Sequence, residues 1–228
     1  PRFEMVLRNA IAITAAAQVI GLILTLAAVQ WQRHVLDRDS KSFFESAAEN
    51  LHHEVARRFA QPLLALKSAR GVYTASGEVT RTEFRDFVGE RDLAIDYPGV
   101  GGLGFIARVP RASLSAFIAL EQQDGAPDFT VNTRGDEADL YVIKFIEPIA
   151  KNRTEWGFDI GQDPVLRQAV ERAVASGEPT LSGKTTRAQD PQESPGFLYF
   201  LPIYRRGTEP YSAPQRAAVL VGLLYAPI

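Results

Sequence analysis

The chain has 228 residues, a formal net charge of −2 and no cysteine, and 46% of its residues are hydrophobic. The near-neutral charge argues against a nucleic-acid-binding protein, which usually carries a strong excess of basic residues. The absence of cysteine excludes thiolate metal sites and cysteine nucleophiles. The length suffices for one large domain or two small ones, each with its own core.

The most hydrophobic segment is Ile11–Val29, which contains no charged side chain. At about 1.5 Å per residue, a helix of this length just crosses about 30 Å of hydrocarbon. Trp31 follows, where an interfacial anchor is common. We therefore expect a transmembrane helix at residues 11–30, after a cytoplasmic stub at residues 1–10. A signal peptide and a buried soluble helix are the alternatives, but the run exceeds a signal-peptide core and no A-x-A site follows. The flanking Lys and Arg residues do not fix the orientation.

Residues 31–70 are predicted to form a long stalk helix. Its apolar residues recur at alternating steps of four and three, close to heptad spacing, at Phe44, Ala48, Leu51, Val55, Phe59, Leu63 and Leu66. Such a stripe indicates either packing on the following domain or a homodimer formed through the stalk, and the two are compatible. Pro62 is expected to kink or restart the helix.

Beyond the stalk, the pattern favours an α+β fold with an antiparallel sheet and helices on one face. We expect helices after Thr80 or Thr82, after Pro110, and after the N-cap at Asp163, with Gly177 closing the last one. The expected strands are Leu103–Val109, Phe129–Gly135, Leu140–Ile149, Trp156–Ile160, Pro179–Arg187, Phe197–Tyr204 and Arg216–Ile228.

No catalytic set is recognisable in the soluble part. All three histidines, His34, His52 and His53, lie in the predicted stalk, so none remains in the folded domain as a general base. His52 and His53 are adjacent and point about 100° apart on a helix, so they cannot share a metal ion, and we expect them to be exposed. We expect no metal and no cofactor. Glu147 and Asp159 keep a carboxylate-only mechanism open, although a hydrogen bond that fixes the loop is the more ordinary role for Glu147.

Five motifs occur in a characteristic order: Glu83, Phe84 and Phe87; a P-G…G-F-I-x-R-V run; Gly157–Asp159; Arg172–Gly177; and Tyr199–Tyr204. In this order and spacing they resemble the CHASE domain, the extracytoplasmic sensory module of receptor histidine kinases, diguanylate cyclases and adenylyl cyclases. The resemblance covers roughly Ala60–Ile228.

The resemblance implies a CHASE domain at residues 71–228 built from two PAS-like antiparallel-sheet subdomains. The membrane-distal one would cover about residues 80–200, and residues 201–228 would complete the membrane-proximal part. A second transmembrane helix and a cytoplasmic output domain, a histidine kinase or a diguanylate cyclase, are expected beyond this chain. The resemblance also places everything after residue 30 outside the cytoplasm, on the periplasmic or extracellular side of the cell inner membrane.

The same resemblance points to a ligand pocket, in which Tyr141, Ile143, Phe145 and Glu147 would share one face of a strand. The expected lining residues are Tyr141, Ile143, Phe145, Glu147, Leu181, Ser182, Tyr199 and Leu201. Aromatic and aliphatic walls with a few polar groups suit a small organic ligand. We therefore expect a sensor that transmits ligand binding through the stalk and membrane helices. A membrane-anchored periplasmic enzyme and a ligand-free interaction module on the same fold are the alternatives.

Overall fold

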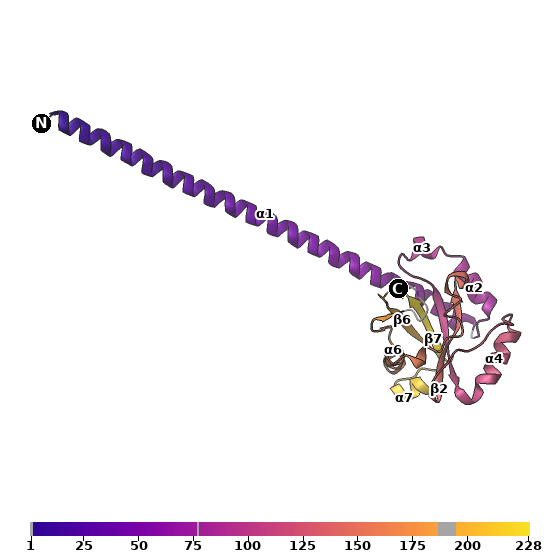
Figure 1. The fold of residues 1–228 in the computed structure, drawn as a ribbon. Coiled ribbons are helices and arrows are strands. Elements are labelled where there is room, and N and C mark those ends of the chain that lie inside the picture. Colours follow the sequence, from indigo (N-terminus) through magenta and orange to yellow (C-terminus); the bar gives the residue numbers. More distant parts are fainter. Residues whose placement is uncertain (1, 77, 187–194) are drawn as a thin grey trace. The chain divides into compact units, whose positions relative to one another are not determined.

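The computed structural model describes residues 2–76, 78–186 and 195–228, with the backbone alone for residues 2–17, 19, 28, 33–47, 58, 186 and 195. The chain divides into two compact units, residues 1–56 and residues 57–228. Helix α1 (Arg2–Ser76) contributes residues to both units (Figure 1).

The described residues of the first unit are helical throughout. Their exposed large apolar side chains are Ile20, Leu22, Ile23, Leu24, Leu26, Val29, Trp31, Leu51 and Val55. No helix within the described part of the chain is long and apolar enough to cross a membrane. Within the predicted span Ile11–Val29, the side chains of residues 11–17, 19 and 28 lie outside that part. His52 and His53 are exposed, as predicted.

The second unit combines the end of α1 with short helices and strands. Its further elements are α2 (Arg81–Gly89), α3 (Leu93–Asp96), β1 (Leu103–Pro110), the 3₁₀ turn η1 (Arg111–Ser113), α4 (Leu114–Gln123), β2 (Asp139–Glu147), α5 (Ile149–Asn152), the 3₁₀ turn η2 (Ile160–Gln162), α6 (Pro164–Ser176), β3 (Thr180–Leu181), β4 (Thr185–Thr186), β5 (Pro195–Gly196), β6 (Leu198–Tyr204), α7 (Ala213–Ala218) and β7 (Leu220–Pro227).

Five strands form one antiparallel sheet in the order β2-β1-β7-β6-β3, and β4 pairs with β5 in a separate small ribbon. The expected α+β class with an antiparallel sheet is therefore confirmed. Strands from both sides of residue 200 pair in this sheet: β7 lies between β1 and β6. The expected boundary between subdomains near residue 200 thus falls within a single sheet, because β6 spans residue 200 and β7 pairs with β1, which comes much earlier in the chain.

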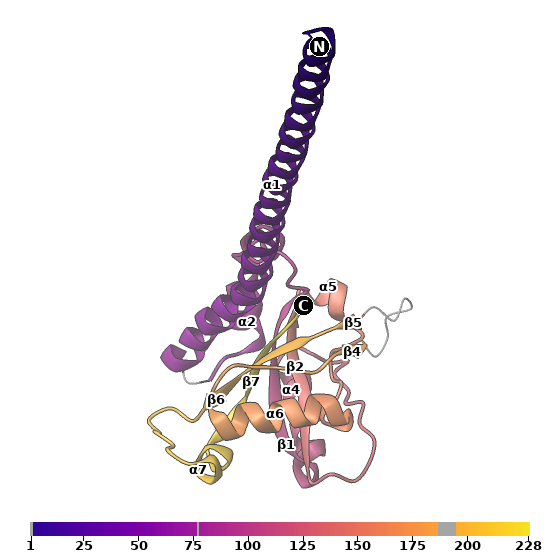
Figure 2. The same ribbon diagram turned by 90° about the vertical axis from the view of Figure 1, so that its left-hand side faces the viewer.

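Helices cover both faces of the sheet, whereas we expected them on one face. On one face, α6 crosses the strands and buries Leu166, Ala169, Val170, Ala173 and Val174 against Ile106, Phe200, Leu223 and Tyr225 (Figure 2). On the other face, the end of α1, together with α2 and α4, packs against residues that include Phe105, Phe145, Leu201 and Leu224. Alternate residues along the strands are apolar toward both sides, so the sheet is a central layer.

The end of α1 belongs to this second core. Leu66 and Tyr73 are buried among its members, and α1 continues through Pro62 to Ser76. The helix therefore does not restart at Pro62, and the predicted end near residue 70 is wrong. Burial of Tyr73 explains the extra turns, since tertiary packing of an apolar face stabilises a helix more than residue propensity does.

Local signals explain the helix ends. The Asp163 side chain accepts hydrogen bonds from the backbone N–H groups of Val165 and Leu166, and Gly177 closes α6 with φ 79°. Thr80, one of the two predicted caps, forms a capping box with Glu83 at the start of α2. The predicted strand Arg216–Ile228 begins instead with α7, because Ser212 and Gln215 form a second capping box there.

Candidate functional site

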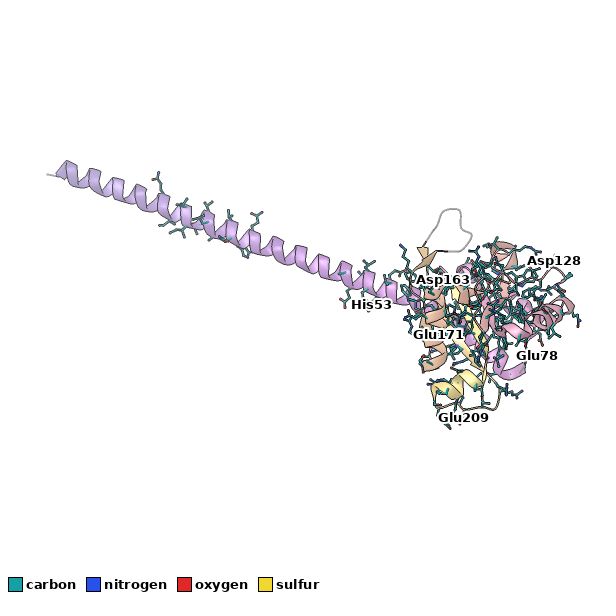
Figure 3. All side chains as sticks on the ribbon, turned by 60° about the horizontal axis from the view of Figure 1, so that its bottom comes forward. His53, Glu78, Asp128, Asp163, Glu171 and Glu209 are labelled. Carbon is teal, nitrogen blue, oxygen red and sulfur yellow. The ribbon has the colours of Figure 1, made fainter. Side chains whose placement is uncertain are left out.

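A cavity of about 750 Å³ opens between two loops, residues 132–137 and 158–163, and the first turn of α6. We name this cavity the α6 groove. Its lining consists of Asn132, Arg134, Gly135, Asp136, Glu137, Phe158, Gly161, Gln162, Asp163, Pro164 and Arg167. Figure 3 labels Asp163 and Glu171, two acidic residues of this region. The volume falls in the range of about 300–1,000 Å³ that is typical of small-molecule sites.

Asp159 holds one of the two loops in place beneath the groove. Its carboxylate is 1% exposed. It accepts hydrogen bonds from the backbone N–H groups of Tyr141 (2.9 Å) and Gly161 (2.9 Å) and from Thr133 Oγ1 (2.8 Å). Both oxygens of this buried carboxylate accept hydrogen bonds from the protein, so its role is to shape the loop.

The predicted strands Phe129–Gly135 and Trp156–Ile160 are not strands in the structure. An isolated bridge between Asn132 and Phe158 joins the two segments, and another between Val142 and Asp159 joins the second segment to β2. Gly157 has φ 80°, and a Cβ there would lie 2.0 Å from the carbonyl oxygen of Thr130. This turn requires glycine and breaks the extended conformation that the alternating residues predicted.

Arg167, on the first turns of α6, ties three segments together. Its Nε donates to the carbonyl oxygen of Gly161 (2.7 Å), and its Nη2 donates to that of Asp139 (3.1 Å). Its guanidinium carbon lies 5.5 Å from the centre of the Tyr141 ring. Burial raises the pKa of Tyr141, and the positive charge of Arg108 partly offsets this effect. The phenol therefore stays neutral at physiological pH, and its ring lies against Arg167 beside the groove.

The rim of the groove carries charges of both signs. Glu137 Oε2 lies 3.9 Å from Arg167 Nη1, and Asp163 is occupied as the α6 N-cap. Arg134 and Asp136 are exposed, on either side of Gly135. Within the described residues, neither side chain makes a hydrogen bond or an ion pair, so both can contact a ligand. No group of three metal-ligating side chains is present in the part of the chain that the structure describes.

The predicted pocket residues lie on both faces of the sheet. The β1–β2 register shifts at Lys144, so Phe105 pairs with Phe145 while Ile106 pairs with Ile143. Tyr141 and Ile143 consequently face α6, whereas Phe145 faces α1 and α2. The expectation that they share one face is wrong, because a β-bulge inserts one extra residue and reverses the alternation.

The remaining candidates are scattered. Glu147 accepts a hydrogen bond from the backbone of Ile149 (2.9 Å), which confirms the loop-fixing role. Leu181 pairs with Tyr199 at the far edge of the sheet, where the Ser182 hydroxyl accepts a hydrogen bond from Leu198 (2.9 Å). Leu201 is fully buried on the α1 face. Of the eight residues, only Tyr141 therefore lies beside the α6 groove.

Arg134, Asp136 and Arg167 line the groove but were not among the predicted pocket residues. The start of α6 was recognised from Asp163 and Pro164, and Arg167 stands four residues after Asp163, one helical turn into the groove. From that spacing, Arg167 could have been predicted to lie near the start of α6 and beside the groove. The two rim charges lie in a segment that we expected to be a strand and its turn, where exposed charges are ordinary.

Comparison with known proteins identifies the family. The CHASE domain family model matches residues 77–228. A search of curated proteins found no match. CHASE domains are extracytoplasmic sensory domains of signalling receptors, and they typically bind small-molecule ligands. Because the match covers most of the chain, including every strand described above, the chain belongs to the CHASE domain family.

Proposed function

We propose that this chain is the ligand-sensing portion of a transmembrane signalling receptor, and that its ligand is a small zwitterion bound in the α6 groove. The observation that carries the proposal is the rim, where Arg134 and Asp136 offer opposite charges on one exposed loop. A molecule with one carboxylate and one ammonium group, such as a free amino acid, matches both charges. Charge-assisted hydrogen bonds to such groups are stronger than neutral ones.

Arg167 gives the groove a route to the rest of the domain. It binds the loop at Gly161, the start of β2 at Asp139 and, through its own backbone, α6. A ligand that draws the two loops together stabilises one arrangement of these three segments over another. A difference of about 1–3 kcal/mol in binding free energy between two states suffices for a typical allosteric response.

Thermal unfolding of the full chain, with each of the twenty common amino acids as a probe, tests the proposal. A ligand at 100 times its dissociation constant adds about 2.7 kcal/mol to the unfolding free energy. For a domain of this size, that corresponds to a rise in Tm of about 5–10 °C. Arg134→Ala and Asp136→Ala should abolish the rise, whereas the exposed controls Arg205→Ala and Asp96→Ala, outside the groove, should keep it. No rise with any amino acid would contradict the zwitterion ligand.

The membrane anchor at residues 11–30 is part of the same proposal. The exposed apolar side chains from Ile20 to Val29 support it, because contiguous apolar surface is rarely left in water. A second membrane helix and an output domain of the histidine kinase or diguanylate cyclase type would complete the receptor in the inner membrane. The expressed chain should resist alkaline extraction from membranes, and its release would contradict the anchor.

Dimerisation through the stalk is a further part of the proposal. Leu51 and Val55 are exposed on α1, four residues apart on one side of the helix. Cysteines at Leu51, Val55 and Phe59 should form cross-linked dimers, whereas a cysteine at the neighbouring His52 should form fewer. Absence of cross-links at all three positions would exclude this dimer.

The two alternatives make different predictions. A ligand-free interaction module would show no thermal shift with any small molecule. An enzyme that uses Glu147 would lose turnover in Glu147→Ala while the fold stays intact.

A further inference from the structure

Another cavity lies where the end of α1 meets β6 and the loop that follows β6, and we name it the α1–β6 cavity. Its volume is about 230 Å³. Its walls come from two segments: Arg70, Tyr73 and Thr74 belong to α1, whereas residues 202–208 belong to β6 and its loop. Among the residues that the structure describes, it shares none of its lining with the α6 groove. A ligand in this cavity touches α1 and the β6 loop together.

The lining carries three positive charges and no negative one. Of the described lining residues, only Arg70, Arg205 and Arg206 are charged, and all three are exposed. None of them forms an ion pair with another described residue. The neighbouring sequence offers no acid either, since residues 61–76 and 195–208 contain no Asp or Glu. The cavity therefore has an unbalanced positive charge, which attracts anions.

The three arginines differ in what they already bind. Arg206 Nη1 donates to the carbonyl oxygen of Ala75 (3.4 Å), in the last turn of α1. This contact offsets the partial negative charge of about one half that a helix C-terminus carries. The Arg70 and Arg205 side chains donate to no acceptor within the described part of the chain. Their guanidinium groups are therefore available to a ligand.

Tyr73 connects the cavity to the hydrophobic core. It is 7% exposed, and its ring stacks on Phe105 with 4.7 Å between the ring centres. Its hydroxyl is buried and has no hydrogen-bond partner among the described residues. Burial raises the pKa of Tyr73, and the negative charge of Glu121 adds to this effect. The phenol is therefore neutral at physiological pH and does not reduce the positive charge of the lining.

We propose that the α1–β6 cavity binds a phosphate group, either as free phosphate or as a small phosphomonoester. A phosphomonoester carries about −1.5 to −2 charges at pH 7 and presents three strong acceptor oxygens. The planar fork of arginine donors matches these oxygens with paired hydrogen bonds. The volume exceeds that of the cavity of about 150 Å³ that holds benzene, so a phosphate group with a short organic substituent fits.

A bound phosphate fastens the end of α1 to the β6 loop. Arg70 holds it from the helix, and Arg205 holds it from the loop. The hydrogen bond between Arg206 and Ala75 already joins the same two segments, and the phosphate adds charge-assisted hydrogen bonds beside it. Because α1 also contains the predicted stalk, phosphate is a second input to this helix that does not pass through the α6 groove.

Isothermal titration calorimetry of the full chain tests the site. The probes are inorganic phosphate, glycerol 3-phosphate and, as its neutral match, glycerol, in a buffer whose only other anion is chloride. We expect saturable binding of at least one phosphate probe and none of glycerol. The phosphate probe that binds more tightly shows whether free phosphate or a monoester is preferred. No saturable binding of either phosphate probe to the folded chain would overturn the proposal.

A pair of double variants locates the binding. Arg70→Gln/Arg205→Gln should weaken phosphate binding by about tenfold or more, because it removes the available guanidinium groups. Both positions are exposed, so the variant should fold. The control Arg85→Gln/Arg153→Gln removes two charges from exposed positions outside the cavity and should keep the affinity within about twofold. An equal loss in both double variants would show that phosphate responds only to the net charge of the chain, and would contradict the site.

The outcome is separable from amino-acid binding in the α6 groove. Arg134→Ala should bind phosphate as the wild type does, and Arg70→Gln/Arg205→Gln should keep the rise in Tm with an amino acid. Phosphate affinity that falls in Arg134→Ala would place the anion in the α6 groove and overturn the α1–β6 site.

Discussion

The two faces of the sheet are stabilised in different ways. On the α6 face, one capped helix packs five apolar residues on the strands. On the α1 face, three helices from distant parts of the chain meet the strands, and Glu121, Arg81 and Lys144 form a buried ion cluster among aromatic rings. Periodicity is sufficient to build the first face, whereas the second depends on partners that are far apart in the sequence.

The largest expected effect is on the charged face. Glu121→Ala leaves Arg81 and Lys144 without their carboxylate, and breaking a buried ion pair in this way costs about 3–5 kcal/mol. We expect a loss of unfolding free energy near 3 kcal/mol, because both cations keep some contact with solvent. Urea unfolding measures it, with the exposed Glu178→Ala on the other face as the control. A loss below about 1 kcal/mol would show that the cluster does not stabilise this face.

Helix α1 offers a matched pair of leucines. Leu66 is fully buried in the α1-face core, whereas Leu64 is 60% exposed. Leu66→Ala should lower the free energy of unfolding by about 2–5 kcal/mol, through lost burial and the cavity left behind. Leu64→Ala should change it by less than about 0.5 kcal/mol. Equal effects in urea unfolding would mean that the end of α1 is not part of the folded core.

Alanine substitutions at two glycines, one in each segment beside the α6 groove, allow a comparison of the two loops. Gly157 and Gly135 both have positive φ, at 80° and 76°. A side chain at Gly135 meets nothing within 4 Å, so Gly135→Ala should cost about 1–2 kcal/mol for the left-handed backbone alone. Gly157→Ala adds a clash with the Thr130 carbonyl and should cost more. Thermal unfolding of the two variants measures the difference, and an equal loss would contradict the close approach of the two loops.

The smallest expected effect concerns the α2 cap. Thr80→Ala removes the side-chain cap and should cost about 1 kcal/mol, whereas Thr82→Ala should cost less. Hydrogen bonds from the Thr80 backbone and side chain lower the pKa of Glu83 below its ordinary value of 4.5. A carboxyl whose pKa is lowered by folding stabilises the fold above its unfolded-state pKa, and that contribution is lost as the pH falls through the folded-state pKa. The loss of unfolding free energy caused by Thr80→Ala should therefore become smaller below about pH 4.5. A loss that is independent of pH would exclude the capping box.

The sequence predicts the α6 face better than the α1 face for a physical reason. The cap at Asp163, the terminator Gly177 and the buried stripe of α6 are local signals, and the structure confirms all of them. The sequence pattern of α4 predicts that Glu121 is exposed. Its two partners, Arg81 and Lys144, lie 40 and 23 positions away in the sequence. No local pattern encodes such a pairing.

The bulge at Lys144 is equally hidden, because a lysine fits the ordinary alternation of a strand. Its consequence is large: it separates Tyr141 from Phe145 and so divides the expected pocket between two faces. The rim of the α6 groove was missed for a related reason. The segment around Arg134 alternates like a strand, but the hydrogen bonds of buried Asp159 and the turn at Gly157 shape it as a loop.

Hydrogen exchange on the full chain tests the central claim most directly, that a zwitterion occupies the α6 groove. The probe is the amino acid that gives the largest rise in Tm. We predict slower exchange in residues 132–137 and 158–163 on binding, and no slowing in the same segments of Arg134→Ala. Protection confined to other parts of the chain, or retained in full by Arg134→Ala, would contradict the account.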